Sequence, residues 1–267
     1  MKIRKSGVYY GIKKTELKNF GFSISEYDYH LPETDWHYHE NPYFMFVLGG
    51  NLKDLNKKGT RLCPQGSFLF LNWQEIHKNT KESSHAKGFH IELDKRWFKE
   101  KQLERGLWEG SKLITNPNLH HTLAKIYYEF MIDDVFSSVS METLVLQLCD
   151  GLWKDYHRSH KMEPAWLNTL EDLIYNDEDI LSLENLSAKL GIHPVHLSRS
   201  FPKYHDITLG EYIRRHKVKK SIPLLMNSKF SLTQIAYSSG FSDQSHYTRT
   251  FKKYFNATPI AFRQAFK

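Results

Sequence analysis

The stretch S-L-E-N-L-S-A-K-L-G-I, from Ser182 to Ile192, returns as S-L-T-Q-I-A-Y-S-S-G-F, from Ser231 to Phe241. A second stretch repeats in the same way, since S-R-S-F-P-K-Y at 198–204 returns as T-R-T-F-K-K-Y at 248–254. Both copies keep a serine before an apolar segment, a glycine at its end, and an arginine and aromatic residues beyond it. The last third of the chain therefore contains a duplicated unit, and this duplication decides its fold.

Each copy opens with residues that favour the start of a helix. Ser231 with Gln234 three residues later has the capping-box pattern, in which each side chain bonds the backbone N–H of the other. Ser182 is an N-cap residue of the same kind, with Asn185 in the corresponding place. We therefore expect a short helix after each serine.

A tight turn and a second helix are predicted to follow. Gly191 and Gly240 end the apolar segments, and glycine accommodates the positive φ that such turns require. The next helix is expected to begin at His193-Pro194 in the first copy, because proline fits a first helical position, and at Ser242 in the second. The pattern predicts two helix-turn-helix motifs.

The second helix of each copy is predicted to have an apolar back and a polar front. At helical spacing the backs contain Leu197, Phe201 and Tyr204 in the first copy, and Tyr247, Phe251, Tyr254 and Phe255 in the second. The fronts contain Val195, Ser198 and Arg199 in the first copy, and Gln244, Ser245, Thr248, Arg249 and Lys252 in the second. Such polar side chains match the donors and acceptors on base edges, so these helices suit the major groove of DNA. The alternative is a pair of ordinary helical hairpins with solvated polar faces.

The charge distribution favours DNA binding. Residues 183–267 contain 14 lysine and arginine residues against 4 aspartate and glutamate residues, a formal charge of +10, while the remainder carries −3 and the whole chain +7. A basic domain attached to a mildly acidic body is typical of nucleic-acid-binding proteins. The run R-R-H-K-V-K-K at 214–220 is predicted to lie on the helix between the two motifs, as either a phosphate clamp or a solvated face.

The second motif carries the signature G-F-x-D-Q-S-x-Y-x-R-x-F-K-K-Y-F-x-x-T-P at 240–259. With two such motifs joined by a long helix, residues 163–267 resemble the AraC/XylS family of transcription regulators. The resemblance implies that the two recognition helices enter successive major-groove segments of double-stranded promoter DNA, and RNA polymerase is a further candidate partner. The DNA-binding residues predicted on this basis are Val195, His196, Ser198, Arg199, Lys203, Gln244, Ser245, Thr248, Arg249 and Lys253.

Three residues depart from the family pattern. Pro202 lacks a backbone donor and disfavours helix at Phe201, so the first recognition helix is expected to be short or bent. Pro223 is expected to interrupt the connecting helix similarly, and Phe262 stands where many members have tyrosine. These three positions lie outside the predicted reading front.

The rest of the sequence argues against several classes of protein. No stretch approaches the ~18 apolar residues of a membrane helix. The basic start M-K-I-R-K-S-G-V-Y-Y has no apolar run behind it, which argues against a signal peptide. Cys63 and Cys149 are the only two cysteines, so we expect no disulfide framework and a reducing, cytoplasmic location.

Short apolar segments bounded by glycine and proline occupy the first part of the chain. Those at 43–48, 67–71 and 88–93 read as strands, and their punctuation predicts a β-barrel or sandwich. W-H-Y-H at 36–39, followed by V-L-G-G and by P-Q-G-S-F-L-F-L-N-W-Q-E-I-H ending at His77, resembles the small cupin barrel that commonly precedes this DNA-binding domain.

The histidines of this region suggest two kinds of site. In metal-binding cupins, paired histidines, a glutamate and a later histidine hold a transition metal; here the glutamate place falls on Tyr43 or Phe44. Three imidazoles could still hold zinc, but without the carboxylate we expect no metal and no cofactor. Polar groups among aromatic rings suit a small organic ligand instead. The predicted ligand-binding residues are Trp36, His37, His39, Tyr43, Trp73 and His77.

From Asn118 to His157 the apolar spacing predicts helices. A helix after the barrel often makes the dimer in this family, so residues 141–153 are the candidate for a homodimer contact. The predicted fold class is α+β with two domains: an N-terminal cupin-like β-barrel with appended helices, and a C-terminal all-α domain with a duplicated helix-turn-helix. We expect the barrel at 1–100, a helical linker at 101–160 and the DNA-binding domain at 161–267.

The sequence thus predicts a non-enzymatic, DNA-binding transcription regulator controlled by a small-molecule effector in the barrel. Two alternatives remain open. The barrel could serve only as a dimerisation scaffold, or it could be a metal-dependent cupin enzyme fused to a DNA-binding domain, which the missing glutamate disfavours.

Overall fold

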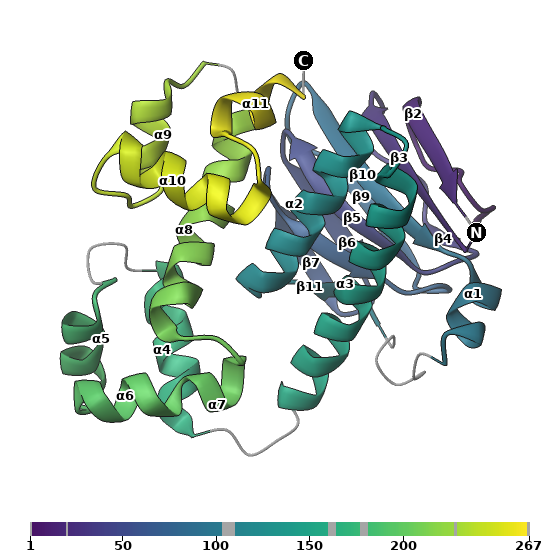
Figure 1. Cartoon of the computed structure of the whole chain (residues 1–267). Coiled ribbons are helices and arrows are strands. Elements are labelled where there is room, and N and C mark those ends of the chain that lie inside the picture. The colour runs from purple at the N-terminus through teal and green to yellow at the C-terminus, as the bar shows by residue number, and fades with distance from the viewer. Residues whose placement is uncertain are drawn as a thin grey trace. The chain divides into compact units, whose positions relative to one another are not determined.

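The computed structural model describes residues 2–19, 21–102, 110–159, 164–176, 181–226 and 229–265. The chain divides into two compact units: residues 1–115 with 123–149, here called the barrel unit, and residues 116–122 with 150–267, here called the helical unit. Figure 1 labels their elements. The strands are β1 (Lys2–Arg4), β2 (Ile12–Asn19), β3 (Phe22–Tyr29), β4 (His37–His39), β5 (Tyr43–Gly49), β6 (Leu52–Asn56), β7 (Gly59–Cys63), β8 (Phe68–Leu71), β9 (His77–Lys81), β10 (Ala86–Leu93) and β11 (Lys112–Leu113). The helices are α1 (Lys95–Glu100), α2 (Pro117–Ile132), α3 (Ser137–Ser159), α4 (Ala165–Asn176), α5 (Leu183–Leu190), α6 (Pro194–Ser200), α7 (Pro202–His205), α8 (Leu209–Met226), α9 (Leu232–Ser238), α10 (Gln244–Phe255) and α11 (Pro259–Gln264).

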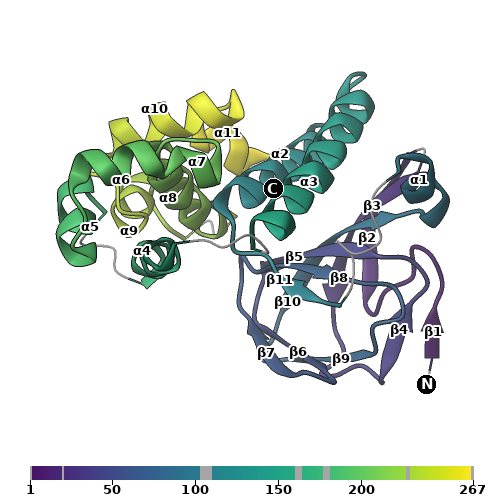
Figure 2. The same cartoon turned by 90° about the horizontal axis from the view of Figure 1, so that it is seen from below.

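Two sheets face each other in the barrel unit (Figure 2). One has the strand order β1-β4-β9-β6-β7 and the other β11-β8-β5-β10-β3-β2. Neighbouring strands are antiparallel except β1 and β4, which run parallel. The three predicted strands correspond to β5, β8 and β10, and the two-sheet barrel confirms the predicted cupin-like architecture.

The central strand β5 is buried on both faces, which explains its unbroken apolar sequence. Tyr43, Met45 and Val47 belong to the core between the sheets, together with Leu69 of β8. The alternate residues lie on the outer face, where the ring of Phe44 packs against Phe68 and Phe70 at centroid distances of 5.7 and 5.4 Å. Because strand side chains alternate, β5 serves two cores at once.

The outer face of the six-stranded sheet is covered by α2 (Figure 2). The Phe89 ring on β10 lies 4.7 Å from the ring of Tyr127 and 5.5 Å from that of Phe130. The Tyr127 hydroxyl also donates a 2.8 Å hydrogen bond to Glu26 on β3. This part of the predicted linker therefore packs on the barrel, because burial of its apolar side chains against the sheet removes them from water.

The apolar stripe of α3 is already covered within one chain. Met141, Val145 and Leu148 are fully buried, although the sequence made the segment containing them the candidate dimer contact. The apolar side chains that α3 leaves to solvent include Val139, at 69% exposure, and Phe136 precedes the helix at 73%. An apolar stripe in sequence does not distinguish an intramolecular core from a subunit contact.

The helical unit confirms the duplicated motif. The Ser182 hydroxyl caps α5, and Ser231 with Gln234 forms the complete capping box at the start of α9. Gly191 and Gly240 occupy the turns with φ of +64° and +80°. The predicted recognition helices correspond to α6 and α10, and α8 joins the two motifs (Figure 1).

The two prolines have different outcomes. The first recognition helix is short as predicted, because α6 ends at Ser200 and α7 begins at Pro202. Phe201 between them nevertheless keeps helical dihedral angles (φ −53°, ψ −46°), so the expectation that Pro202 disfavours helix at Phe201 is wrong. The prediction for Pro223 is wrong, since α8 continues through it to Met226. Ile222 and Leu225 on either side are buried, so their packing stabilises the last turn despite the lost backbone hydrogen bond.

Two further sequence expectations can be compared with the structure. Cys63 and Cys149 are both buried. Among the described residues, no helix combines the length and apolar character that crossing a membrane requires.

Candidate functional site

The predicted DNA-binding residues lie on α6, α7 and α10. All of them are exposed except Thr248, which is partly buried. The opposite sides of α6 and α10 are buried, including Leu197 and Phe201 in the first motif and Tyr247 and Phe251 in the second. Both recognition helices therefore have the apolar back and solvent-facing front that the sequence predicted.

Local hydrogen bonds fix the start of each recognition helix. In α6 the His193 Nδ1 atom accepts from the backbone N–H of Val195 at 3.3 Å, and Pro194 occupies the first turn. The second recognition helix begins at Gln244, two residues later than predicted, because the Asp243 carboxylate is its N-cap and accepts from His246 N–H at 2.7 Å. Aspartate at this place also complements the positive end of the helix dipole.

Gln244 has a partner in the preceding helix. The Thr233 hydroxyl on α9 donates a 2.7 Å hydrogen bond to Gln244 Oε1. The amide oxygen is thereby turned toward Thr233, and the amide NH₂ is the end of the side chain that faces away from this bond. The sequence analysis did not identify Thr233, because a contact between two helices has no local signature.

Cationic side chains from two helices surround the Glu211 carboxylate on α8. Its carboxylate accepts from Arg214 at 3.0 Å and from Arg215 at 3.3 Å, and Lys253 of α10 lies 3.7 Å away. The Lys253 side chain is nevertheless 67% exposed. It can therefore approach a phosphate while Glu211 limits where its ammonium group stands.

The barrel encloses a small cavity of about 40 Å³. His37, His39 and Tyr43 line it as predicted, and His77 adjoins it, since the Tyr43 hydroxyl lies 3.3 Å from His77 Nε2. Trp36 and Trp73 are not among the lining residues. Trp36 is 45% exposed, and Trp73 is 39% exposed with the Lys95 ammonium group 4.2 Å from the centre of its ring.

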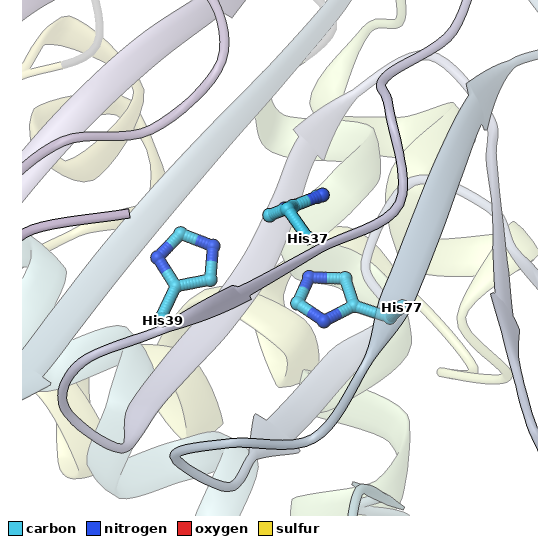
Figure 3. A group of neighbouring side chains, drawn as sticks. All are labelled: His37, His39 and His77. Carbon is cyan, nitrogen blue, oxygen red and sulfur yellow. The ribbon is translucent and has the colours of Figure 1, made fainter. Parts of the chain in front are cut away.

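Three imidazole rings gather in the barrel (Figure 3). His37 and His39 come from β4 and His77 from β9, and one ring nitrogen of each lies within 4.8 Å of the others. The Nδ1 atoms of His37 and His77 bond to the backbone carbonyls of Asp35 and Glu75 at 2.8 and 3.0 Å. A Nδ1–H donated to each carbonyl leaves Nε2 as the lone-pair atom, which is the arrangement that metal-binding histidines use.

Burial keeps these rings neutral. It lowers the pKa of His37 to about 3, helped by the nearby His77, and it also lowers the pKa values of His39 and His77. Neutral imidazoles can coordinate a divalent cation or bond the hydroxyl and carbonyl groups of an organic molecule. Among the described residues, the group of possible metal ligands consists of these three histidines and includes no carboxylate.

The sequence analysis missed a second polar group in the barrel. His90 on β10 stacks on Tyr9 with ring centroids 3.9 Å apart, and its Nε2 lies 2.8 Å from the Tyr29 hydroxyl. Glu92, also on β10, accepts from Gly7 N–H, Tyr9 O–H and the Asn41 amide. The period-two alternation of β10 could have revealed both, because His90 and Glu92 share the face opposite to Phe89 and Ile91.

Comparison with known proteins agrees with the geometry of the helical unit. Residues 186–265 match a family described as a helix-turn-helix domain. The chain is 37% identical over 98 residues to the probable transcription factor PqrA of Proteus vulgaris, covering 37% of this chain and 80% of that protein. It is 38% identical over 97 residues to the multiple antibiotic resistance protein MarA of Escherichia coli, covering 36% of this chain and 74% of MarA. Apo ToxT from Vibrio cholerae aligns over 93% of this chain and 99% of its own with a TM-score of 0.41 and 16% identity.

Two exposed recognition helices on a duplicated helix-turn-helix scaffold, with these relatives, define a DNA-binding transcription regulator. The chain belongs to the AraC family, with a cupin-like barrel as its N-terminal unit.

Acid should destabilise the barrel through His90. Burial lowers its pKa to about 3, below the roughly 6.5 of an unfolded chain, so its contribution to stability is full above pH 6.5 and declines as the pH falls toward 3. Between pH 7 and pH 5 this one group should cost about 2 kcal/mol of unfolding free energy. Urea denaturation of His90→Gln should show a smaller loss between the two pH values than the wild type. An equal loss in both proteins would show that His90 does not titrate in this way.

Thr233 should determine which base Gln244 prefers. With its oxygen held by Thr233, the Gln244 amide presents donors, which favours guanine or thymine acceptors over the donor–acceptor pair of adenine. Selection of binding sites from randomised DNA should show a changed preference at one base pair in Thr233→Val. Thr233→Ser, which keeps the hydroxyl, is the matched control and should retain the wild-type preference. A uniform loss across all positions would contradict this role.

Proposed function

We propose that this AraC-family protein reads a specific promoter sequence with α6 and α10, and that a small molecule in the barrel controls its binding. The pair of exposed polar fronts on otherwise buried recognition helices is the observation that carries the DNA-reading part. The name of PqrA, a probable transcription factor, supports regulation.

The proposed contacts fall into two kinds. Arg249 and Arg199 can pair bidentately with guanine, so they are proposed to specify bases. Lys203 and Lys253, near the ends of their helices, are proposed to bind phosphates, which positions the helices without reading sequence. The short α6, ended at Ser200, presents fewer turns to the groove than α10, so the first motif should contribute less to specificity.

Substitution of the two kinds of residue should have different effects. Arg249→Ala should cost about 1–3 kcal/mol on the cognate site and relax the preference at one or two base pairs. Arg199→Ala should have the same kind of effect but a smaller one. Lys253→Ala should weaken cognate and random DNA about equally. The measurement is a titration of full-length protein with both DNAs at one fixed salt concentration, since affinity depends steeply on salt.

If all three substitutions reduced binding to every sequence alike, the assignment of the reading front would be wrong. Lys18→Ala, on strand β2 of the barrel unit, is a matched control for loss of a surface lysine and should leave both affinities unchanged.

Ligand control is proposed from the barrel cavity. Its volume of about 40 Å³ admits a few water molecules, since one water needs roughly 10–15 Å³, whereas sites for small organic molecules span about 300–1,000 Å³. A sugar or aromatic effector would therefore need part of the wall to move. Tyr9 and Tyr10 are wall residues of the segment before β2, which Glu92 holds through hydrogen bonds from Gly7 and Tyr9. Movement of this segment would couple occupancy of the cavity to the shape of the barrel.

A metal ion is the second candidate for the barrel. The three converging imidazoles, two with Nδ1 held by backbone carbonyls, favour it, and their number suits zinc or a related divalent ion. Against it stands the place of the usual glutamate, which Tyr43 or Phe44 occupies. An organic effector remains the primary proposal.

Two measurements on the full-length protein distinguish these candidates. An organic effector at 100 times its dissociation constant should stabilise the protein by about 2.7 kcal/mol in a thermal-shift screen of sugars, sugar acids and aromatic compounds. Protein purified without chelator should contain less than one equivalent of metal. Near-stoichiometric metal that disappears in His37→Ala, but not in the exposed control His85→Ala, would establish the metal candidate instead.

If neither an effector nor a metal were found while the protein still self-associated, the barrel would be a dimerisation scaffold. A homodimer, contact with RNA polymerase, a cytoplasmic location and the absence of enzymatic activity belong to the same proposal.

A further inference from the structure

The basic run at 214–220 is divided between the two sides of α8. His216 is buried against the ring of Tyr175, with centroids 5.0 Å apart, and the Lys219 ammonium group lies 4.9 Å from the centre of the same ring. Arg214 and Lys217 instead face a groove on another side of the helix. The run is therefore neither a uniform clamp nor a uniform solvated face.

This groove lies between the two recognition helices and has a volume of about 340 Å³. Ser198 of α6 lines one wall and His246 of α10 the other, while Gly210, Arg214 and Lys217 of α8 form the floor at helical spacing. Ser198 belongs to the proposed reading front of α6, and His246 neighbours Ser245 on that of α10. The remaining lining residues are Leu181, Leu183, Thr208, Leu209, Ile213 and Phe241. None of these described lining residues is acidic.

The two cations of the floor differ in their partners. Arg214 donates to Glu211 at 3.0 Å, so a carboxylate already offsets its charge. Among the ion pairs of the described residues, none includes Lys217. Burial, with a smaller effect from Lys220, lowers the pKa of Lys217. A partly buried ammonium group without a counter-charge is costly, and an incoming anion would remove that cost.

The position of Lys217 is fixed by the second motif. Its Cε, Cδ and Cγ atoms lie 3.4, 3.7 and 3.8 Å from the point where a Cβ on Gly240 would stand. Gly240 is the turn glycine of that motif, and the equivalent point on Gly191 in the first motif has nothing within 4 Å. The lysine stem therefore packs on the turn that precedes α10, and this packing links its ammonium group to the placement of the second recognition helix.

When two recognition helices enter successive major-groove segments, the DNA backbone must cross the space between them. Duplex DNA carries one negative charge per roughly 1.7 Å of its axis, so a phosphate is the anion most available to a groove at that place. We propose that the groove between α6 and α10 receives this stretch of DNA backbone, and that the Lys217 ammonium group binds one of its phosphates. This inference rests on the proposed DNA-binding function of both recognition helices.

Lys217→Met tests the proposal in the full-length protein, because methionine keeps an apolar stem over Gly240 and removes only the charge. The binding constants for cognate and random DNA are measured over a series of KCl concentrations. Loss of one phosphate contact should make the log–log slope less negative by about 0.9. If the variant and the wild type bind equally at 1 M KCl, this change of slope makes the variant bind about fivefold more weakly than the wild type at 0.15 M KCl, for both DNAs alike. Lys220→Met, on the same helix but outside the groove lining, should retain the wild-type slope.

Lys217→Arg should restore the wild-type slope, since it returns the charge. An unchanged slope in Lys217→Met, with thermal unfolding like that of the wild type, would overturn the proposal, and so would an equal change in Lys220→Met. Arg249→Ala, measured in parallel, separates this outcome from failure of the proposed function. If wild-type protein binds cognate DNA specifically and Arg249→Ala loses that specificity, an unaltered Lys217→Met refutes the groove alone.

Discussion

Burial of α8 on several sides is the constraint on which the DNA-binding half of this protein depends. Leu209, Tyr212 and Ile213 complete the core of the first motif, while the later turns of α8 pack against α9, α10 and α11. Each recognition helix is short, and a short isolated helix is marginal in water, so both depend on this shared core for their stability. One rigid element thereby sets the register of two reading surfaces. It also explains why α8 tolerates Pro223: the tertiary contacts of its last turns outweigh one missing backbone bond.

The two units differ in where their most constrained charged and titratable groups lie. The helical half displays its surplus of cations, and its main anion, Glu211, positions several of them near the recognition helices. The barrel also encloses titratable groups: burial keeps His37 and His90 uncharged, and Glu92 is stabilised by three donors. The exposed cations of the helical unit suit a polyanion, because the attraction between them acts over distance and weakens with salt. The buried, uncharged histidines of the barrel suit a neutral ligand or a coordinated ion, which must displace water from the cavity to reach them.

Where the controlling interactions are local, the sequence was a good guide to the structure. The caps at Ser182 and Ser231, the glycine turns and the end of α6 before Pro202 involve residues within a few positions of each other, so their geometry follows from the chain itself. The prediction for Pro223 differed because distant contacts compete with the local signal. Pro223 was expected to interrupt a helix that packing sustains. The apolar stripe of α3 is buried within its own chain, and the homodimer contact stays a prediction. The start of α10 moved from Ser242 to Gln244 because Asp243 is the side chain that caps it.

The sequence by itself determined the duplicated motif, the polar fronts of its recognition helices and the barrel-forming strands, because periodicity and turn chemistry are written in neighbouring residues. Only the tertiary structure decided which side chains meet. It brought His37 and His39 to His77 across β4 and β9 and left Trp36 and Trp73 at the surface. It also joined Thr233 to Gln244 and placed Lys217 on Gly240. These contacts connect residues separated by a turn, a strand or a whole helix. Their formation depends on how elements pack, and packing is a property of the folded chain that no single stretch of sequence contains.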